Sequence, residues 1–241
     1  MLLLALALAP GFAIIFFFYS KDKYEREPLK NLVISFLLGM LSTIPAVIIQ
    51  YSLEPTLFSA LQEKSVLYYT LFAFVVVGFG EELCKFAMLR LYAYRKKAFS
   101  EPFDGIMYSV MVSMGFATLE NVAYVYEGGI FTGLLRMFLS VPAHAAFGVL
   151  MGYHVGLAKF DSANSTYHLW KGLLLAAFFH GAFDFFLFLQ ESKEVTQYVS
   201  GGLLFLSAIV SYWIAVRVSL RSIRLHHDLS RQDFERRNNT L

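Results

Sequence analysis

Residues 66–89 read VLYYTLFAFVVVGFGEELCKFAML. The stretch is apolar as far as Gly80 and then places Glu81, Glu82 and Lys85 within the same helix-length segment. Roughly 20 mostly apolar residues are enough for a helix to cross the hydrocarbon core of a bilayer. A charged side chain near the middle of such a helix costs at least ~2.5–3.5 kcal/mol and usually serves a function. The stretch therefore predicts a membrane-spanning helix that carries functional charges.

The composition of the whole chain points the same way. Of its 241 residues 57% are hydrophobic and 16% are charged, and the mean hydropathy is +0.56. A soluble domain averages about 25% charged residues, and a chain of this size could not bury so much apolar surface in one core. The same numbers exclude a disordered chain, and a formal charge of +2 gives no electrostatic case for nucleic-acid binding. A single cysteine, Cys84, excludes an intramolecular disulfide and a cysteine-based zinc site.

We therefore expect an all-α polytopic membrane protein with about seven transmembrane helices. The seven apolar segments are approximately residues 2–19, 31–52, 66–89, 104–126, 131–158, 169–190 and 199–219. The first is interpreted as a span and not as a cleaved signal peptide, because the positive charges follow it. Residues 1–241 are expected to form one integral-membrane domain, with the core that carries the chemistry at about 66–190 and a polar cytoplasmic tail at 220–241.

The distribution of basic residues predicts the orientation. Sixteen of the 20 Lys and Arg residues lie in the segments 20–30, 90–103 and 159–171 and in the tail from Arg217 onward. Only Lys64, Arg136 and Lys193 lie in the connections on the other side. By the positive-inside rule the first set is cytoplasmic, so the N-terminus is predicted outside and the C-terminus inside.

Ionisable residues cluster in four consecutive spans. The candidate site residues are Glu81, Glu82 and Lys85, then Glu120 and Asn121, then His144, and finally His180 and Asp184. The pairs Glu81 with Lys85 and His180 with Asp184 are each four residues apart, so each pair shares a helix face. We expect these groups to face one another or a hydrated cavity, because burial toward lipid would be too costly. Counting ~1.5 Å per residue places the cluster between the midplane and the outer face.

This set of residues is sufficient for peptide hydrolysis without a metal. An ionised glutamate beside a trapped water can take its proton as the water attacks a carbonyl. The oxyanion that forms needs hydrogen-bond donors, and His180 oriented by Asp184 can supply one. His144 or Asn121 can supply a further contact.

Four motifs in order resemble the PrsW family of intramembrane proteases. They are Glu81-Glu82-Leu83-Cys84-Lys85, Phe116 to Asn121 (FATLEN), His144 to Gly148 (HAAFG) and His180 to Asp184 (HGAFD). The stretch Tyr19-Ser20-Lys21-Asp22, the pair Glu27-Pro28 and the pair Asp104-Gly105 are also similar to that family. The likeness spans nearly the whole chain, and four motifs on separate spans are far more specific than any one alone.

The resemblance implies membership of the wider glutamic intramembrane protease group, which includes the CAAX prenyl endoproteases. It assigns Glu81 as the general base, Glu82 as its neighbour, and His180 with Asp184 to the oxyanion side. Glu120 stands where the CAAX branch has a histidine, and Lys85 falls one position before the arginine of that branch, which leaves the role of Glu120 open. PrsW proteins of Gram-positive bacteria cut a membrane-bound anti-sigma factor on its extracytoplasmic side. A single-pass substrate of this kind and a bacterial cell-membrane location are therefore expected, with no cofactor.

Other interpretations remain open at this level. The acids and histidines are adequate zinc or manganese ligands, which permits a metal-dependent protease, although no HExxH motif is present. The same midplane carboxylates would suit a cation or proton transporter, although no internal repeat is visible. A catalytically silent scaffold, with Glu81 and Lys85 as a structural ion pair, is a further alternative.

Overall fold

A computed structural model describes residues 1–22, 25–61 and 65–239, and these residues form helices and short connections without any strand. Lys23 and Lys64, both used in the charge count, lie outside the described residues. The long helices are α1 (Leu2–Lys21), α2 (Leu29–Ala60), α5 (Pro102–Phe138), α6 (Ser140–Phe160), α7 (Ser165–Phe188) and α9 (Gly201–Asn239). The shorter elements are α3 (Val66–Leu71), η1 (Phe72–Phe79), α4 (Gly80–Leu91), η2 (Ala93–Arg95), η3 (Leu189–Glu191) and α8 (Lys193–Thr196).

The all-helical membrane fold is confirmed for the described part of the chain. Five stretches in it are long and apolar enough to cross a membrane, namely Leu2–Lys21, Leu29–Leu57, Pro102–Phe160, Ser165–Glu191 and Gly201–Arg237. The stretch Pro102–Phe160 contains both α5 and α6. Residues 66–91 are helical throughout, but they are divided into α3, the π-helix η1 and α4. The count of seven crossings and the orientation of the termini stay predictions.

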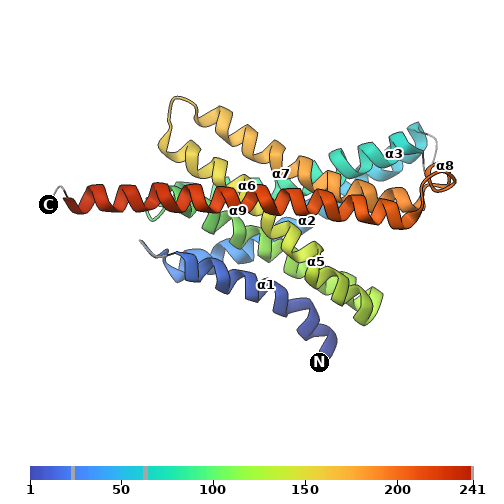
Figure 1. The fold of residues 1–241 in the computed structure, drawn as a ribbon, viewed down its shortest axis with the longest axis horizontal. Helices are drawn as coiled ribbons and strands as arrows, with labels where there is room; N and C mark the ends of the chain where they lie inside the picture. Colours follow the sequence, from blue (N-terminus) through green and yellow to red (C-terminus); the bar gives the residue numbers. More distant parts are fainter. Residues whose placement is uncertain (23–24, 62–64, 240–241) are drawn as a thin grey trace.

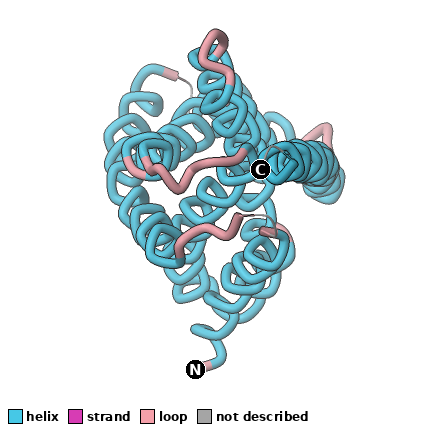
Figure 2. Tube along the Cα trace, turned by 90° about the vertical axis from the view of Figure 1, so that its left-hand side faces the viewer, coloured by secondary structure: helices cyan, strands magenta, loops and turns pink. Residues whose placement is uncertain are grey.

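The long helix α5 forms the centre of the packing. It contacts α1, α2, α4, α6 and α9, and all of its residues from Pro102 to Thr118 are buried. A side chain at Gly105 or Gly115 would collide with the backbone of α6 or α2 respectively, so both positions require glycine for close helix approach. In Figure 1 α9 runs along the longest dimension of the molecule, and Figure 2 shows it nearly end-on at one side of the bundle.

The predicted span 131–158 is wrong in its first part. Residues up to Phe138 belong to α5, and α6 begins only at Ser140. Within α5 the backbone of Gly129 has φ +74°, a conformation that side-chain-bearing residues rarely adopt, and it kinks the helix there. Pro142 is tolerated in α6 because it lies in the first turn, where its missing N–H has no helical acceptor. The kink turns residues 130–138 back along residues 120–125, since Arg136 contacts Glu120 and Asn121 and Gly133 lies against Val125. This reversal shapes the site described below.

A second group of acids ties the α1–α2 connection to the start of α5. Tyr108 donates a hydrogen bond to Glu27, and Asp22 accepts a hydrogen bond from the Glu27 backbone N–H. Glu101 and Asp104 form a capping box at the beginning of α5. Burial raises the pKa of Glu27 to about 7, and burial together with the nearby charge of Asp104 raises the pKa of Glu101 to about 8. Below about pH 7 both carboxyl groups are therefore mostly neutral in the folded protein.

The two raised pKa values predict a fall in stability as the pH rises. Above about pH 4.5 the unfolded chain has released protons that Glu27 and Glu101 still hold in the folded state. Their contribution to the free energy of unfolding is therefore complete below about pH 4.5 and is lost as the pH passes through 7 to 8. Thermal unfolding in detergent between pH 4.5 and 8.5 measures this slope.

The substitution Glu27→Gln should flatten the slope, because glutamine stays neutral at every pH. Glu235 is more than half exposed and pairs with Arg231 on α9, so Glu235→Gln is a matched control that should leave the slope unchanged. A melting temperature that climbs between pH 5 and 8 would contradict the prediction.

Candidate active site

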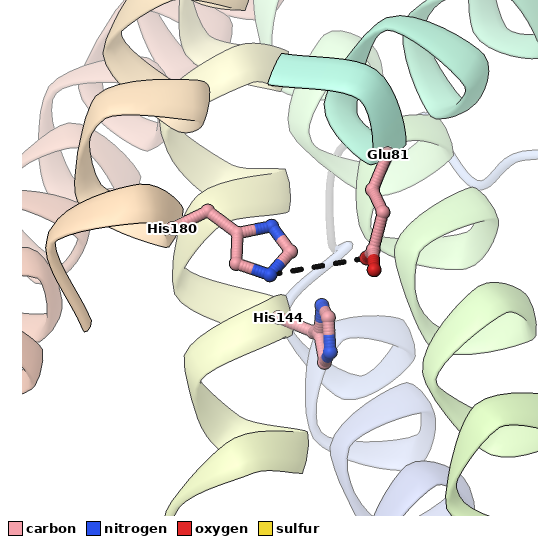
Figure 3. Close-up of side chains that lie close together, drawn as sticks. All are labelled: Glu81, His144 and His180. Atoms are coloured by element: carbon pink, nitrogen blue, oxygen red, sulfur yellow. Dashed lines mark ion pairs between the residues drawn. The ribbon is translucent and has the colours of Figure 1, made fainter. Parts of the chain in front are cut away.

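The helices bring the predicted site residues together from four elements. Glu81, Glu82 and Lys85 lie on α4, Glu120 and Asn121 on α5, His144 on α6, and His180 and Asp184 on α7. Each of Glu81, His144 and His180 has a donor atom within 4.8 Å of the donor atoms of the other two. Figure 3 shows these three side chains pointing toward one another from three different helices.

The π-helix η1 sets the position of the two glutamates. It ends directly before α4, so Glu81 and Glu82 lie in the first turn after the widened segment. A side chain at Gly78 would meet the backbone of Ala177 and Gly181 at 2.8 Å, so η1 packs directly against the backbone of α7. This close approach places Glu82 beside His180, and π-helical segments are frequent at functional sites for this kind of reason.

Lys85 is the buried cation at the centre of the site. Its side chain is almost completely buried, and its Nζ lies 2.8 Å from Glu82 Oε1 and 3.4 Å from Glu81 Oε2. The same atom lies 3.2 Å from His144 Nδ1 and 3.9 Å from the centre of the Phe116 ring. An ammonium group can only donate, so His144 must accept through an unprotonated Nδ1 and carry its proton on Nε2. That proton points at Glu120 Oε2, which is 2.9 Å away.

His180 is held between carboxylates on both sides of its ring. Its Nδ1 lies 2.9 Å from Glu82 Oε1. Its Nε2 lies 3.2 Å from Asp184 Oδ2 and 3.8 Å from Glu81 Oε2. The ring stacks on Phe147, which fixes its plane. Glu82 therefore orients the ring, and the opposite nitrogen is left to face Glu81 and Asp184.

Glu120 forms an ion pair with Arg136, a residue that the sequence analysis assigns to an outer connection and not to the site. Arg136 Nη2 lies 2.8 Å from Glu120 Oε2, and Arg136 Nε donates to Asn121 Oδ1 at 2.9 Å. The kink at Gly129 makes this contact possible, because it turns the end of α5 back toward Glu120. Arg136 was counted only as a charge in an outer connection. A lone arginine seven residues after a Gly-Gly pair within an apolar stretch was the signal that could have found it.

A cavity of about 180 Å³ lies where these groups meet. Among its lining residues are Glu81, Glu120, Arg136, His144, His180 and Asp184. The space is polar and large enough for several water molecules. Glu82 and Lys85 do not line it, and the Glu82 side chain is fully buried behind Glu81. Of the paired glutamates, Glu81 is therefore the one that faces the cavity.

The structure places Asn121 outside the cavity. Asn121 was expected as a possible contact for the reacting group, but its amide donates to the backbone carbonyl of Ala7 and its oxygen accepts from Arg136. It is fully buried and does not line the cavity, because it lies one helical position away from Glu120 and faces α1 instead.

Two lining residues, Gln50 on α2 and Tyr124 on α5, were not predicted at all. Of the other seven predicted residues, five line the cavity, whereas Lys85 contacts Glu81 and Glu82 contacts His180 without lining it. The roles of all seven stay predictions.

The sequence is similar to one known protein family over most of its length. A family model described as "PrsW family intramembrane metalloprotease" matches residues 27–215. Protease PrsW of Geobacillus kaustophilus is 39% identical over 217 residues, covering 89% of each chain. Protease PrsW of Halalkalibacterium halodurans is 33% identical over 95% of this chain and 99% of its own, and that of Bacillus subtilis is 37% identical over 77% and 82%. No solved structure matches this chain significantly.

The buried ion pairs predict a large loss of stability when one partner is removed. Glu82→Ala leaves the Lys85 ammonium without its nearest carboxylate, and an uncompensated buried charge costs about 3–5 kcal/mol. The free energy of unfolding, measured with denaturant in detergent micelles, should fall by that amount. The double variant Glu82→Ala, Lys85→Ala should lose much less than the two single variants combined.

An exposed ion pair on α9 gives the matched control. Glu235 lies 3.2 Å from Arg231, and both side chains are more than half exposed. Glu235→Ala should change the free energy of unfolding by about 0–1 kcal/mol. Equal effects of Glu82→Ala and Glu235→Ala would show that Lys85 does not depend on Glu82.

Proposed function

Because this chain belongs to the PrsW family of intramembrane proteases, we propose that it hydrolyses a peptide bond in a single-pass membrane substrate with a water activated by Glu81. The single observation that supports this most is the polar cavity inside an apolar helix bundle, with Glu81 facing it from one side and His180 and His144 from the others. Family membership favours a protease over the transporter that the sequence left open.

In the proposed reaction Glu81 is the general base. It accepts a proton from a water in the cavity as the water oxygen attacks the carbonyl carbon of the scissile bond. The Lys85 ammonium, 3.4 Å from Glu81 Oε2, balances the charge of the carboxylate. When the C–N bond breaks, the proton held by Glu81 passes to the leaving nitrogen, so that Glu81 ends the cycle ionised.

The oxyanion of the tetrahedral intermediate needs donors on the other side of the cavity. His180 Nε2 faces the cavity beside Asp184, and the family resemblance assigns this pair to the oxyanion. Glu82, bonded to His180 Nδ1, is a positioning residue in this scheme. Glu120 also acts through others, since it holds the His144 ring and is itself held by Arg136.

A metal-dependent version is the second candidate, and three observations favour it. The matching family is described as a metalloprotease family, and Glu81, His144 and His180 offer three donors of the types that zinc prefers. The carboxylate of Glu82 on the far nitrogen of His180 also fits the usual support of a ligating histidine. These three residues would hold the ion, which would activate water as a Lewis acid. We favour the version without metal because the Lys85 ammonium already faces two of the three donors.

We also propose how the protein is arranged in the membrane and on which side it cuts its substrate. The protein is a multi-pass bacterial membrane protein. We propose seven crossings with the N-terminus outside, one integral-membrane domain with its catalytic core at about 66–190, and a cytoplasmic tail from about 220. The proposed substrate resembles an anti-sigma factor and is cut near its extracytoplasmic side.

Loss of the Glu81 carboxylate tests the proposed chemistry. Glu81→Gln keeps the size of the side chain but cannot accept the proton, so cleavage should fall by at least about 10²–10⁴-fold. The assay is cleavage, in proteoliposomes, of a single-pass probe that contains an anti-sigma-factor transmembrane segment with its outer flanking residues. Glu235→Gln, in the exposed part of α9, is the control and should cleave at the wild-type rate. Near-normal cleavage by a folded Glu81→Gln variant would end the proposal.

Chelation separates the two versions of the mechanism. Protein dialysed against a strong chelator and shown to be metal-free by elemental analysis should keep its activity on the same probe. If activity disappears with the metal and returns when zinc is added, the version with Glu81, His144 and His180 as ligands is correct. In that case substitution of any one of the three should also lower the bound zinc.

A further inference from the structure

A groove between α2 and α5 opens beside the catalytic cavity. It encloses about 320 Å³, and we refer to it as the α2–α5 groove. Thr43, Ala46 and Val47 form its wall on α2, and Phe116, Leu119 and Ala123 form its wall on α5. The groove lies on the outside of the bundle, because the Val47 and Leu119 side chains are 46% and 37% exposed. In a membrane protein such apolar exposed walls face the lipid.

The groove and the catalytic cavity share a boundary. Gln50, Glu81, Glu120 and Tyr124 line both spaces. A chain lying in the groove would therefore be next to the Glu81 carboxylate without crossing any packed helix. The small, exposed side chain of Ala123 permits the close backbone approach that membrane helices use when they associate.

Gln50 lies at this boundary with a half-buried polar side chain. Its carboxamide makes no hydrogen bond within residues 1–22, 25–61 and 65–239. A substrate must unwind locally to expose its peptide bond to water, and unwound backbone in an apolar setting needs new partners. A carboxamide offers one donor group and one acceptor group, which matches a peptide N–H and C=O. The boundary is thus suited to an unwound polypeptide and not to a lipid chain.

Two acids flank the end of the groove that is predicted to face outward. Glu127 lines the groove on α5, two turns beyond Glu120 on the same face. Glu54 lies on α2, one turn beyond Gln50. Neither carboxylate has an ion-pair partner among the residues that the structure describes. A basic residue just beyond the membrane end of a bound helix would complement both.

We propose that the α2–α5 groove receives the transmembrane segment of the substrate, and that Glu54 and Glu127 select segments with a Lys or Arg just beyond their outer end. This inference rests on the function proposed above, since it names where that substrate binds and which class of substrate fits.

Disulfide cross-linking tests the location without requiring catalysis. In a Glu81→Gln, Cys84→Ala background, Ala123→Cys should cross-link to a cysteine in the outer half of the transmembrane segment of the same probe in proteoliposomes. Val210→Cys is the matched control, because Val210 is 48% exposed on α9, which does not form a wall of the groove. We expect at least about tenfold more cross-linked product at Ala123. Equal yields at the two positions overturn the groove as the docking site even if wild-type protein cleaves the probe.

A charge exchange tests the selectivity. Glu127→Lys, in protein with Glu81 intact, should lower kcat/KM several-fold for a probe with lysine beyond its outer end. The same variant should regain cleavage on a probe with glutamate at that position, while wild-type protein shows the reverse preference. If Glu127→Lys cleaves both probes like the wild type, the basic-residue preference is wrong. If neither protein cleaves either probe, the proposed protease function fails, whereas cross-linking still reports on the groove.

Discussion

The buried ammonium group of Lys85 is the constraint on which the site depends. Hardly any of its side chain is accessible, so its charge must be balanced by protein groups. Glu81 and Glu82 supply two carboxylates from the same helix, and His144 supplies a lone pair from another. An unpaired charge inside the helix bundle would be costly, so the contact between Lys85 and His144 holds α4 and α6 in one relative position. The same arrangement leaves Glu81 as the glutamate of the pair that faces the cavity.

A second ion pair completes the site from the opposite side. Glu120 is held by Arg136, which reaches it only because Gly129 reverses the direction of α5. Glu120 then fixes His144, whose other nitrogen contacts Lys85. Arg136, Glu120, His144, Lys85 and Glu82 therefore form one connected series of contacts beside the cavity. Such a connected network keeps each charge compensated while leaving room between the groups for water.

Part of this site could be predicted from helical spacing. Glu81 with Lys85, and His180 with Asp184, are pairs within one helix, and both pairs are in contact in the structure. Convergence of the four spans was also expected, because unpaired charges facing lipid are too costly. Neighbouring positions on a helix point about 100° apart, so spacing alone did not decide that Glu120 faces the cavity and Asn121 faces α1. Gln50 was missed because placing an uncharged amide in an apolar helix costs less free energy than placing a charged side chain there, so it does not stand out in the sequence.

The sequence by itself determined that the chain is a helical membrane protein, which ionisable residues lie within its apolar segments and which family it resembles. These follow from local properties, namely hydropathy over about 20 residues, the cost of buried charge and the order of motifs along the chain. Only the tertiary structure decided which glutamate of the pair faces the cavity, that Arg136 belongs to the site, and that a groove between α2 and α5 leads to it. These three features depend on how the helices are rotated about their axes and on the backbone reversal at Gly129. Hydropathy and motif order along the sequence specify neither the rotation nor the reversal.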